Sequence, residues 1–147
     1  MGLIDDTGRG KVGVDTAIFI YWIEESPVWL PVIEPLFRAA DRGQIELVTS
    51  ALTLLEVLVI PYRANDDALA GRYETLLSRG RGVRLVDISR QQMRRAAGIR
   101  AKWGVRTPDA LQLAAALDAG CSSFITNDRR LPPVDGLRVL RLRAYGG

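Results

Sequence analysis

The sequence predicts a single α/β domain built on a largely parallel sheet, and three observations lead to this prediction. Short β-like runs alternate with helical stretches along the chain. The 147 residues fit one domain of ordinary size. A hydrophobic content of 48% is enough to bury a sizeable core, and a charged content of 25% is normal for a globular protein.

The predicted elements follow one another in a regular order. The first ten residues are polar and contain glycine, which predicts a loose leader (1–10) before the folded domain (11–147). Strands are expected at 11–15, 45–49, 83–88, 123–126 and, as a fifth, 138–142. Helices are expected at 16–24, 27–42, 51–62, 66–79, 89–103 and 107–120.

Several helix starts carry capping signals. Ser50 is expected to cap the helix that follows it. Ser89 and Gln92 have the spacing of a capping box. Thr107 and Pro108 predict another start, with threonine as the N-cap and proline at the first helical position.

The chain contains no histidine and only one cysteine, Cys121. A histidine general base, a Ser-His-Asp triad and a histidine-rich zinc site are therefore excluded. Any metal must be a hard cation held by oxygen ligands, which indicates Mg²⁺ or Mn²⁺. Cys121 has no partner for an internal disulfide, no apolar run reaches the length of a membrane span, and no signal-peptide pattern opens the chain. These features predict a cytoplasmic protein.

Basic residues exceed acidic ones, and the net charge is +3. All of the basic residues except Lys11 and Lys102 are arginine, a side chain well suited to phosphate. A basic surface attracts polyanions, although the clusters also fit an ordinary solvated surface in an arginine-rich chain. The clusters lie at Arg79, Arg81 and Arg84, at Arg90, Arg94, Arg95, Arg100 and Lys102, and at Arg129 and Arg130.

Four acidic residues are expected at one edge of the sheet. Asp15 ends the first strand, and Asp128 directly follows the fourth. Glu56 lies in the second turn of the helix after strand two, and Asp109 in the first turn of the helix before strand four. Because crossover helices begin where parallel strands end, all four lie near the carboxyl edge, where ligands bind in such folds.

Each acid also has a purely structural interpretation. Asp15 could cap a helix, Asp109 could favour a helix dipole, and Asp128 could be an ordinary turn residue. Glu56 lies in an almost wholly apolar segment, which predicts a helix that is buried on most sides. In such a helix Glu56 would need a partner or a metal. Alternatively, Thr53 and Glu56 form the exposed stripe of that helix.

Four segments together resemble the PIN-domain ribonucleases, most closely the VapC-type toxins of bacterial toxin–antitoxin pairs. The order and spacing of the segments match the family over about residues 11–142. Any one of them is weak evidence, but the set is specific. The segments are Val14-Asp15-Thr16, the run from Ser50 to Glu56, the run from Arg106 through Asp109 to Ala116, and Phe124-Ile-Thr-Asn-Asp128.

This resemblance implies about five parallel strands and metal-dependent cleavage of RNA. It also implies a homodimer and an antitoxin that blocks the active-site groove. The metal ligands by match of position are Asp15, Glu56, Asp109 and Asp128, and the supporting polar residues are Thr16, Thr126 and Asn127. From their places beside the acids, the residues expected to hold the RNA backbone are Arg106, Arg129 and Arg130.

The chemistry is consistent with this assignment, because clustered carboxylates repel one another unless a cation lies among them. The main alternative is a non-catalytic PIN-like RNA-binding or scaffold protein, and the presence of all four acids disfavours it. A phosphatase of the haloacid dehalogenase kind needs an acid two residues after the first, where this chain has Ala17. A response-regulator receiver needs a lysine late in the chain, and the last one is Lys102.

Overall fold

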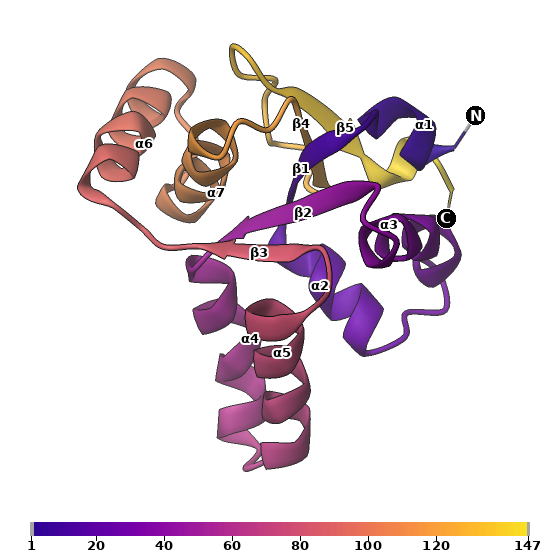
Figure 1. Cartoon of the computed structure of the whole chain (residues 1–147). Coiled ribbons are helices and arrows are strands. Elements are labelled where there is room, and N and C mark those ends of the chain that lie inside the picture. Colours follow the sequence, from indigo (N-terminus) through magenta and orange to yellow (C-terminus); the bar gives the residue numbers. More distant parts are fainter. Residues whose placement is uncertain (1, 147) are drawn as a thin grey trace.

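Five parallel strands form one sheet at the centre of the computed structural model, which describes residues 2–146 (Figure 1). Their order across the sheet is β3-β2-β1-β4-β5, and every neighbouring pair is parallel. The predicted fold class is therefore confirmed. The strands are β1 (Gly10–Val14), β2 (Ile45–Ser50), β3 (Val83–Val86), β4 (Ser123–Thr126) and β5 (Arg138–Arg141).

Helices cover both faces of this sheet and form two separate cores. One core joins the sheet to α1 to α5, and the other joins it to α6 and α7. The helices are α1 (Leu3–Thr7), α2 (Thr16–Ile23), α3 (Leu30–Asp41), α4 (Leu52–Arg63), α5 (Asp67–Arg79), α6 (Arg90–Trp103) and α7 (Thr107–Asp118), followed by the short 3₁₀ helix η1 (Leu142–Ala144). No helix within residues 2–146 is long and apolar enough to cross a membrane.

Alternation along the strands divides the apolar side chains between the two cores. In β2, Leu47 packs with the core of α1 to α5, whereas Val48 packs with α6 and α7. In β4, Ile125 and Phe124 divide in the same way. Successive side chains of a strand point to opposite faces, so a sheet covered on both sides carries continuous apolar runs.

The strand order creates a switch point between β1 and β4. From β1 the chain proceeds to β2 and β3 on one side, and later returns to place β4 and β5 on the other side. Loops that leave adjacent strands in opposite directions open a crevice at the carboxyl ends of those strands. The backbone N–H of Asp15 still donates to the carbonyl of Ile125 at 3.0 Å, which ties the two strand ends together at this crevice.

The structure corrects the expectation of a loose leader. Leu3–Thr7 forms helix α1, Leu3 is buried in the main core, and the Tyr145 hydroxyl donates to Asp6. An apolar pair, Leu3 and Ile4, provides the packing that anchors this segment. Met1 lies outside the described residues.

Three capping predictions are also corrected in detail. Ala51, rather than Ser50, is the N-cap of α4, although the Ser50 hydroxyl accepts from the backbone N–H of Leu52 at 3.1 Å. Arg106, rather than Thr107, is the N-cap of α7. Ser89 caps α6 through the N–H of Gln92 as predicted, but the Gln92 side chain donates to the Asp87 carbonyl, so the capping box is only half formed.

Candidate active site at the carboxyl edge of the sheet

All four predicted acids line a single pocket of about 530 Å³ at the switch point. Asp15 lies between β1 and α2, and Glu56 lies on α4. Asp109 is in the first turn of α7, and Asp128 follows β4. Four separate elements thus bring carboxylates to the same cavity, as the parallel topology predicts.

Asp15 both caps a helix and faces the pocket. Its Oδ1 accepts from the backbone N–H of Thr16 at 2.8 Å, and its Oδ2 accepts from the Thr126 hydroxyl at 2.7 Å. Burial raises the pKa of Asp15 above its ordinary value; these two hydrogen bonds oppose the shift, and the nearby charges of Asp109 and Glu56 add to it. The capping interpretation and the functional one therefore hold together.

Glu56 is exposed, and the helix that carries it is not buried on most sides. Leu55 and Ile60 on the same helix are 61% and 69% exposed, whereas Thr53 is fully buried. The expected burial of this helix on most sides is therefore wrong, and so is the expected exposed stripe of Thr53 and Glu56, because Thr53 is buried. Helices α4 and α5 project from the sheet as a pair (Figure 1). The Glu56 side chain is held by the Thr16 hydroxyl, which donates to its Oε1 at 2.7 Å.

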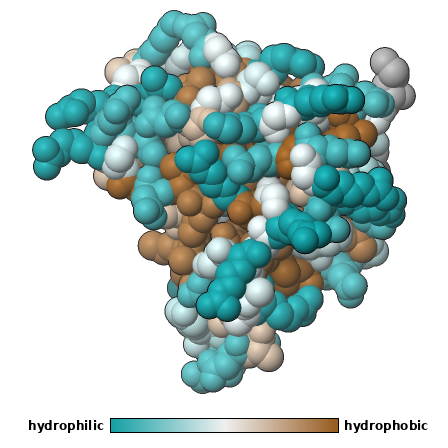
Figure 2. Space-filling model, in the orientation of Figure 1, coloured by the Kyte–Doolittle hydropathy of each residue, from teal (hydrophilic) through white to brown (hydrophobic). Residues whose placement is uncertain are grey.

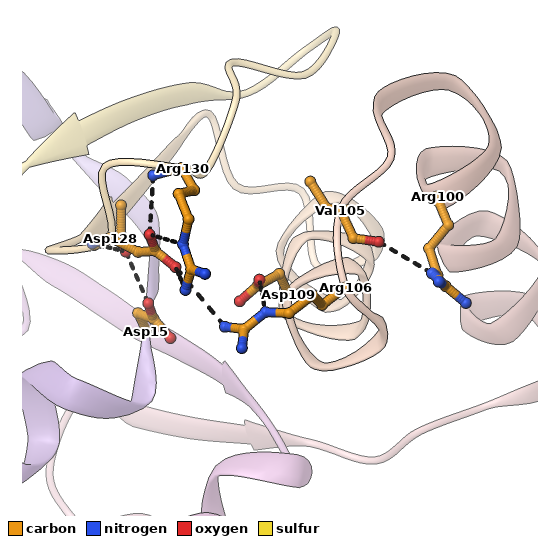
Figure 3. A network of polar contacts seen from close by, with 8 residues as sticks. Asp15, Arg100, Val105, Arg106, Asp109, Asp128 and Arg130 are labelled. Atoms are coloured by element: carbon orange, nitrogen blue, oxygen red, sulfur yellow. Dashed lines mark hydrogen bonds and ion pairs between the residues drawn. The ribbon is translucent and has the colours of Figure 1, made fainter.

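Two arginines approach the remaining acids (Figure 3). Arg106 Nε lies 3.4 Å from Asp109 Oδ2, and its Nη2 lies 4.0 Å from Asp128 Oδ2. Arg130 binds Asp128 through its guanidinium, at 3.2 and 3.3 Å, and through its backbone N–H at 2.9 Å. These contacts, led by the Arg130 side chain, lower the pKa of Asp128 below its ordinary value. Both arginines are largely exposed, so the pairs are weak and exchangeable.

The other predicted residues divide between support and surface. Thr126 is buried beneath the pocket, and its hydroxyl accepts from the N–H of Asp128 at 3.0 Å while donating to Asp15. Asn127 lines the pocket and donates to the Tyr21 hydroxyl at 3.1 Å. Arg129 is exposed and lies outside the pocket lining.

Two polar residues of the pocket lining, Gln112 and Tyr21, were not predicted as site residues. Gln112 is the one polar side chain in the apolar stretch from Ala110 to Ala116, and it lies three residues after Asp109, on the same face of the helix. That isolated polar residue is a signal that could have identified it. Tyr21 lies six residues beyond Asp15, and no sequence feature distinguishes it from a packing residue.

The donor set suits a hard divalent cation. Four carboxylates face one cavity, and mutual repulsion contributes to the raised pKa of Asp15. Within residues 2–146, no three acidic side chains stand close enough to hold an ion between them as they lie. Thr16, Arg106 and Arg130 hold three of the four carboxylates through the contacts above. The residues fit Mg²⁺ or Mn²⁺ in chemistry, and binding would require these side chains to turn.

Comparisons with known proteins agree with this architecture. The chain is similar to a toxin–antitoxin complex from Klebsiella pneumoniae (TM-score 0.65, 21% identity, covering 86% of this chain and 94% of that one). It is also similar to VapBC2 from Rickettsia felis bound to a promoter DNA fragment (TM-score 0.67, 15% identity, 90% and 98% covered). A third similar structure is DNA-bound VapBC from Salmonella typhimurium (TM-score 0.63, 20% identity, 92% and 98% covered).

At these identities the structural likeness establishes the fold alone. Comparison with curated protein sequences found no match. The sequence profile of the PIN domain matches residues 12–137, a span that contains most of β1, all of β2, β3 and β4, and all four acids. The chain therefore belongs to the PIN domain family.

Proposed function

We propose that this chain is a metal-dependent endoribonuclease and the toxin of a type II toxin–antitoxin pair, with Mg²⁺ or Mn²⁺ as its cofactor. The observation that carries the proposal is the convergence of four carboxylates from four separate elements on one pocket. A solvated or capping role would explain each acid singly but not their common cavity. Pocket-facing acids with no histidine among them suit a hard cation and a phosphodiester substrate.

In this proposal Asp15, Glu56, Asp109 and Asp128 hold the cation. A bound divalent cation would neutralise charge on the phosphodiester and lower the pKa of an attacking water. Thr16 and Thr126 orient Glu56 and Asp15 through the hydrogen bonds described above. Arg106 and Arg130 lie at the pocket edge with largely exposed guanidiniums, so they can exchange carboxylate for the RNA backbone. Arg129 would extend this basic edge.

The proposed partners are an RNA substrate, a cognate antitoxin and a second copy of the chain. Similar folds were solved as toxin–antitoxin complexes, which supports the antitoxin. The exposed apolar residues Leu55, Val59 and Tyr62 recur at intervals of four and three along α4, so they form one stripe, here called the α4 stripe. An exposed apolar stripe of this kind supports a two-fold homodimer, in which the same patch of each copy would be buried against the other.

The second candidate function is a non-catalytic PIN-like RNA-binding or scaffold protein. It would need the basic surface but not four converging acids. The hydrogen bonds from Thr16 and Thr126 favour the nuclease. They fix the orientation of the Glu56 and Asp15 carboxylates, and a scaffold protein that performs no chemistry would not require this.

The nuclease proposal is tested by Asp15→Asn and Asp109→Asn. Each substitution should lower RNA cleavage at least about 100-fold, since removal of a metal ligand costs several kcal/mol of transition-state stabilisation. Cleavage should stop in EDTA and return with Mn²⁺. Expression of the wild-type chain should arrest bacterial growth, and Asp15→Asn should relieve the arrest.

The matched control is Asp67→Asn, which changes an exposed acid of α5 outside the pocket and should leave cleavage unchanged. Cleavage that persists in EDTA would refute the metal. An Asp15→Asn protein that is folded and as active as the wild type would refute the site. RNA binding by the wild type without cleavage would instead favour the scaffold.

A further inference from the structure

A cluster of buried polar side chains adjoins the pocket, and two of its members, Thr16 and Gln112, line it. Gln112 of α7 is only 4% exposed, and it is in hydrogen-bond contact with groups from α2, β2 and α4. A buried amide without hydrogen-bond partners would lower the stability of the fold. The Gln112 amide is therefore held in an orientation that pairs both its oxygen and its nitrogen. The members of this Gln112 cluster are Thr16, Thr49, Ser50, Thr53 and Gln112.

The neighbours of Gln112 decide which way its amide points. Oε1 accepts from the backbone N–H of Ser50 at 3.3 Å. Nε2 donates to the hydroxyls of Thr53 at 2.7 Å and Thr16 at 3.2 Å. A rotated amide would set its NH₂ group against the Ser50 N–H, and two donors would face each other. The amide nitrogen therefore faces Thr16.

This orientation determines where the Thr16 proton goes. An amide NH₂ group only donates, so the Thr16 hydroxyl accepts from Gln112 and keeps its own proton free. That proton is directed to Glu56 Oε1, 2.7 Å away. Glu56 is exposed, and Thr16 is the one side chain among the described residues that hydrogen-bonds to it. Without that bond the carboxylate would sample many rotamers.

We propose that Gln112 is a positioning residue that fixes Glu56 through Thr16, an inference that rests on the proposed nuclease function. Gln112 touches no substrate or ion in this scheme. One of its amide protons polarises and orients the Thr16 hydroxyl while the other is donated to Thr53, and the Thr16 hydroxyl holds Glu56 toward the pocket. Hydrogen bonds in such a chain strengthen one another, so the loss of the first weakens the last.

The test compares Gln112→Met with Gln92→Met. Gln92 of α6 is also 4% exposed, and its Nε2 donates to the Asp87 carbonyl, so it matches Gln112 in burial but makes no hydrogen bond to Thr16 or to the other members of the Gln112 cluster. Gln112→Met should lower kcat for RNA cleavage about tenfold, because a tenfold loss corresponds to the free energy of about one hydrogen bond. KM should change less than about twofold. Calorimetric titration with Mn²⁺ alone should show affinity about threefold or more below wild type. Gln92→Met should match wild type in both measurements.

A double-variant cycle with Thr16→Val separates positioning from general support of the fold. If Gln112 acts through Thr16, the combined variant should be no worse than Thr16→Val alone. The inference would be overturned if the activity losses of the two single variants multiplied in the combined variant. It would also be overturned if Gln112→Met behaved like Gln92→Met. Either result would leave the nuclease proposal standing. Wild-type protein that binds no Mn²⁺ would overturn both. If the wild type binds Mn²⁺ but cleaves no RNA, only the nuclease proposal fails, and the Mn²⁺ titrations still decide the role of Gln112.

Discussion

At the scale of single residues, Asp15 shows why a capping residue can also be a functional one. Its two carboxylate oxygens are engaged separately, one by the N–H of Thr16 and the other by the hydroxyl of Thr126. The helix cap uses only one oxygen, so the carboxylate remains at the pocket wall. Its burial makes the charged form costly, and a cation beside it would remove that cost.

The raised pKa of Asp15 predicts the pH dependence of metal binding. A protonated carboxyl is a poor ligand, so Mn²⁺ affinity should decline as pH falls through the raised pKa of Asp15. The decline should begin above the ordinary Asp value of 3.8. The other charged groups that face Asp15 are Glu56 from α4 and Asp109 from α7. Calorimetric titration with Mn²⁺ between neutral and acid pH measures the effect.

The same pKa gives the sign of the stability effect without metal. An Asp whose pKa is raised in the folded state binds its proton more tightly there than in the unfolded chain. Its contribution to stability therefore falls as pH rises from the unfolded pKa through the folded one.

The control for the pH dependence of metal binding is Asp67→Asn, which should keep the wild-type pH profile of Mn²⁺ affinity. An affinity that stays constant until pH falls to the ordinary Asp value would contradict the role of burial.

At the scale of elements, the close packing of α7 on β1 places Asp109 beside Asp15. Gly13 makes that approach possible. A Cβ at Gly13 would lie 2.7 Å from Phe124 Cδ1 and 2.8 Å from Ala116 Cβ, both closer than real contacts allow. The glycine is thus required for space rather than for an unusual backbone conformation. The first turn of α7 brings Asp109 to the pocket that the other three acids line.

Gly13→Ala should therefore destabilise the fold by about 1–3 kcal/mol, the usual cost of overpacking a core. Chemical denaturation measures the change. The matched control is Gly98→Ala in α6, where a Cβ meets nothing within 4 Å. Gly98→Ala should stabilise by roughly 0.5–1 kcal/mol, because alanine is the better helix former. Equal effects from the two substitutions would argue against close packing at Gly13.

At the scale of the whole molecule, the α4 stripe is apolar surface that the described chain does not cover. Figure 2 shows apolar atoms over the upper part of α4, near the end of β3. Leu55 and Tyr62 are each more than half exposed, and both lie in a helix that also carries a pocket acid, Glu56. Contiguous exposed apolar residues usually mark an interaction surface. A dimer through this face would bring two pockets into one particle.

Val59→Asp should convert the proposed homodimer to a monomer, because two buried charges would face each other across a two-fold axis. Light scattering after size-exclusion chromatography should give twice the 16.2 kDa chain mass for the wild type and the chain mass for the variant. Val28→Asp, at an exposed apolar residue outside the α4 stripe, should remain dimeric. A wild-type protein that is monomeric at high concentration would contradict the dimer.

The sequence by itself determined the element order, the parallel sheet and the common edge of the acids. These follow from local patterns, since apolar periodicity and helix starts act over a few residues, and parallel strands share one carboxyl edge. The helix ends were predicted within one or two residues at α2 and α5 because short-range signals define them. The absence of histidine from the sequence narrowed the proposed cofactor to a cation bound by oxygen ligands.

The tertiary structure alone decided which side chains meet. Thr16 and Gln112 are 96 residues apart, and no local pattern announces their hydrogen bond. The order β3-β2-β1-β4-β5, the arginine contacts to Asp109 and Asp128, and the packing of α1 arise from long-range pairing. The exposure of α4 was misjudged for the same reason: an apolar run indicates a surface that needs covering, but only the three-dimensional arrangement shows whether the same chain covers it.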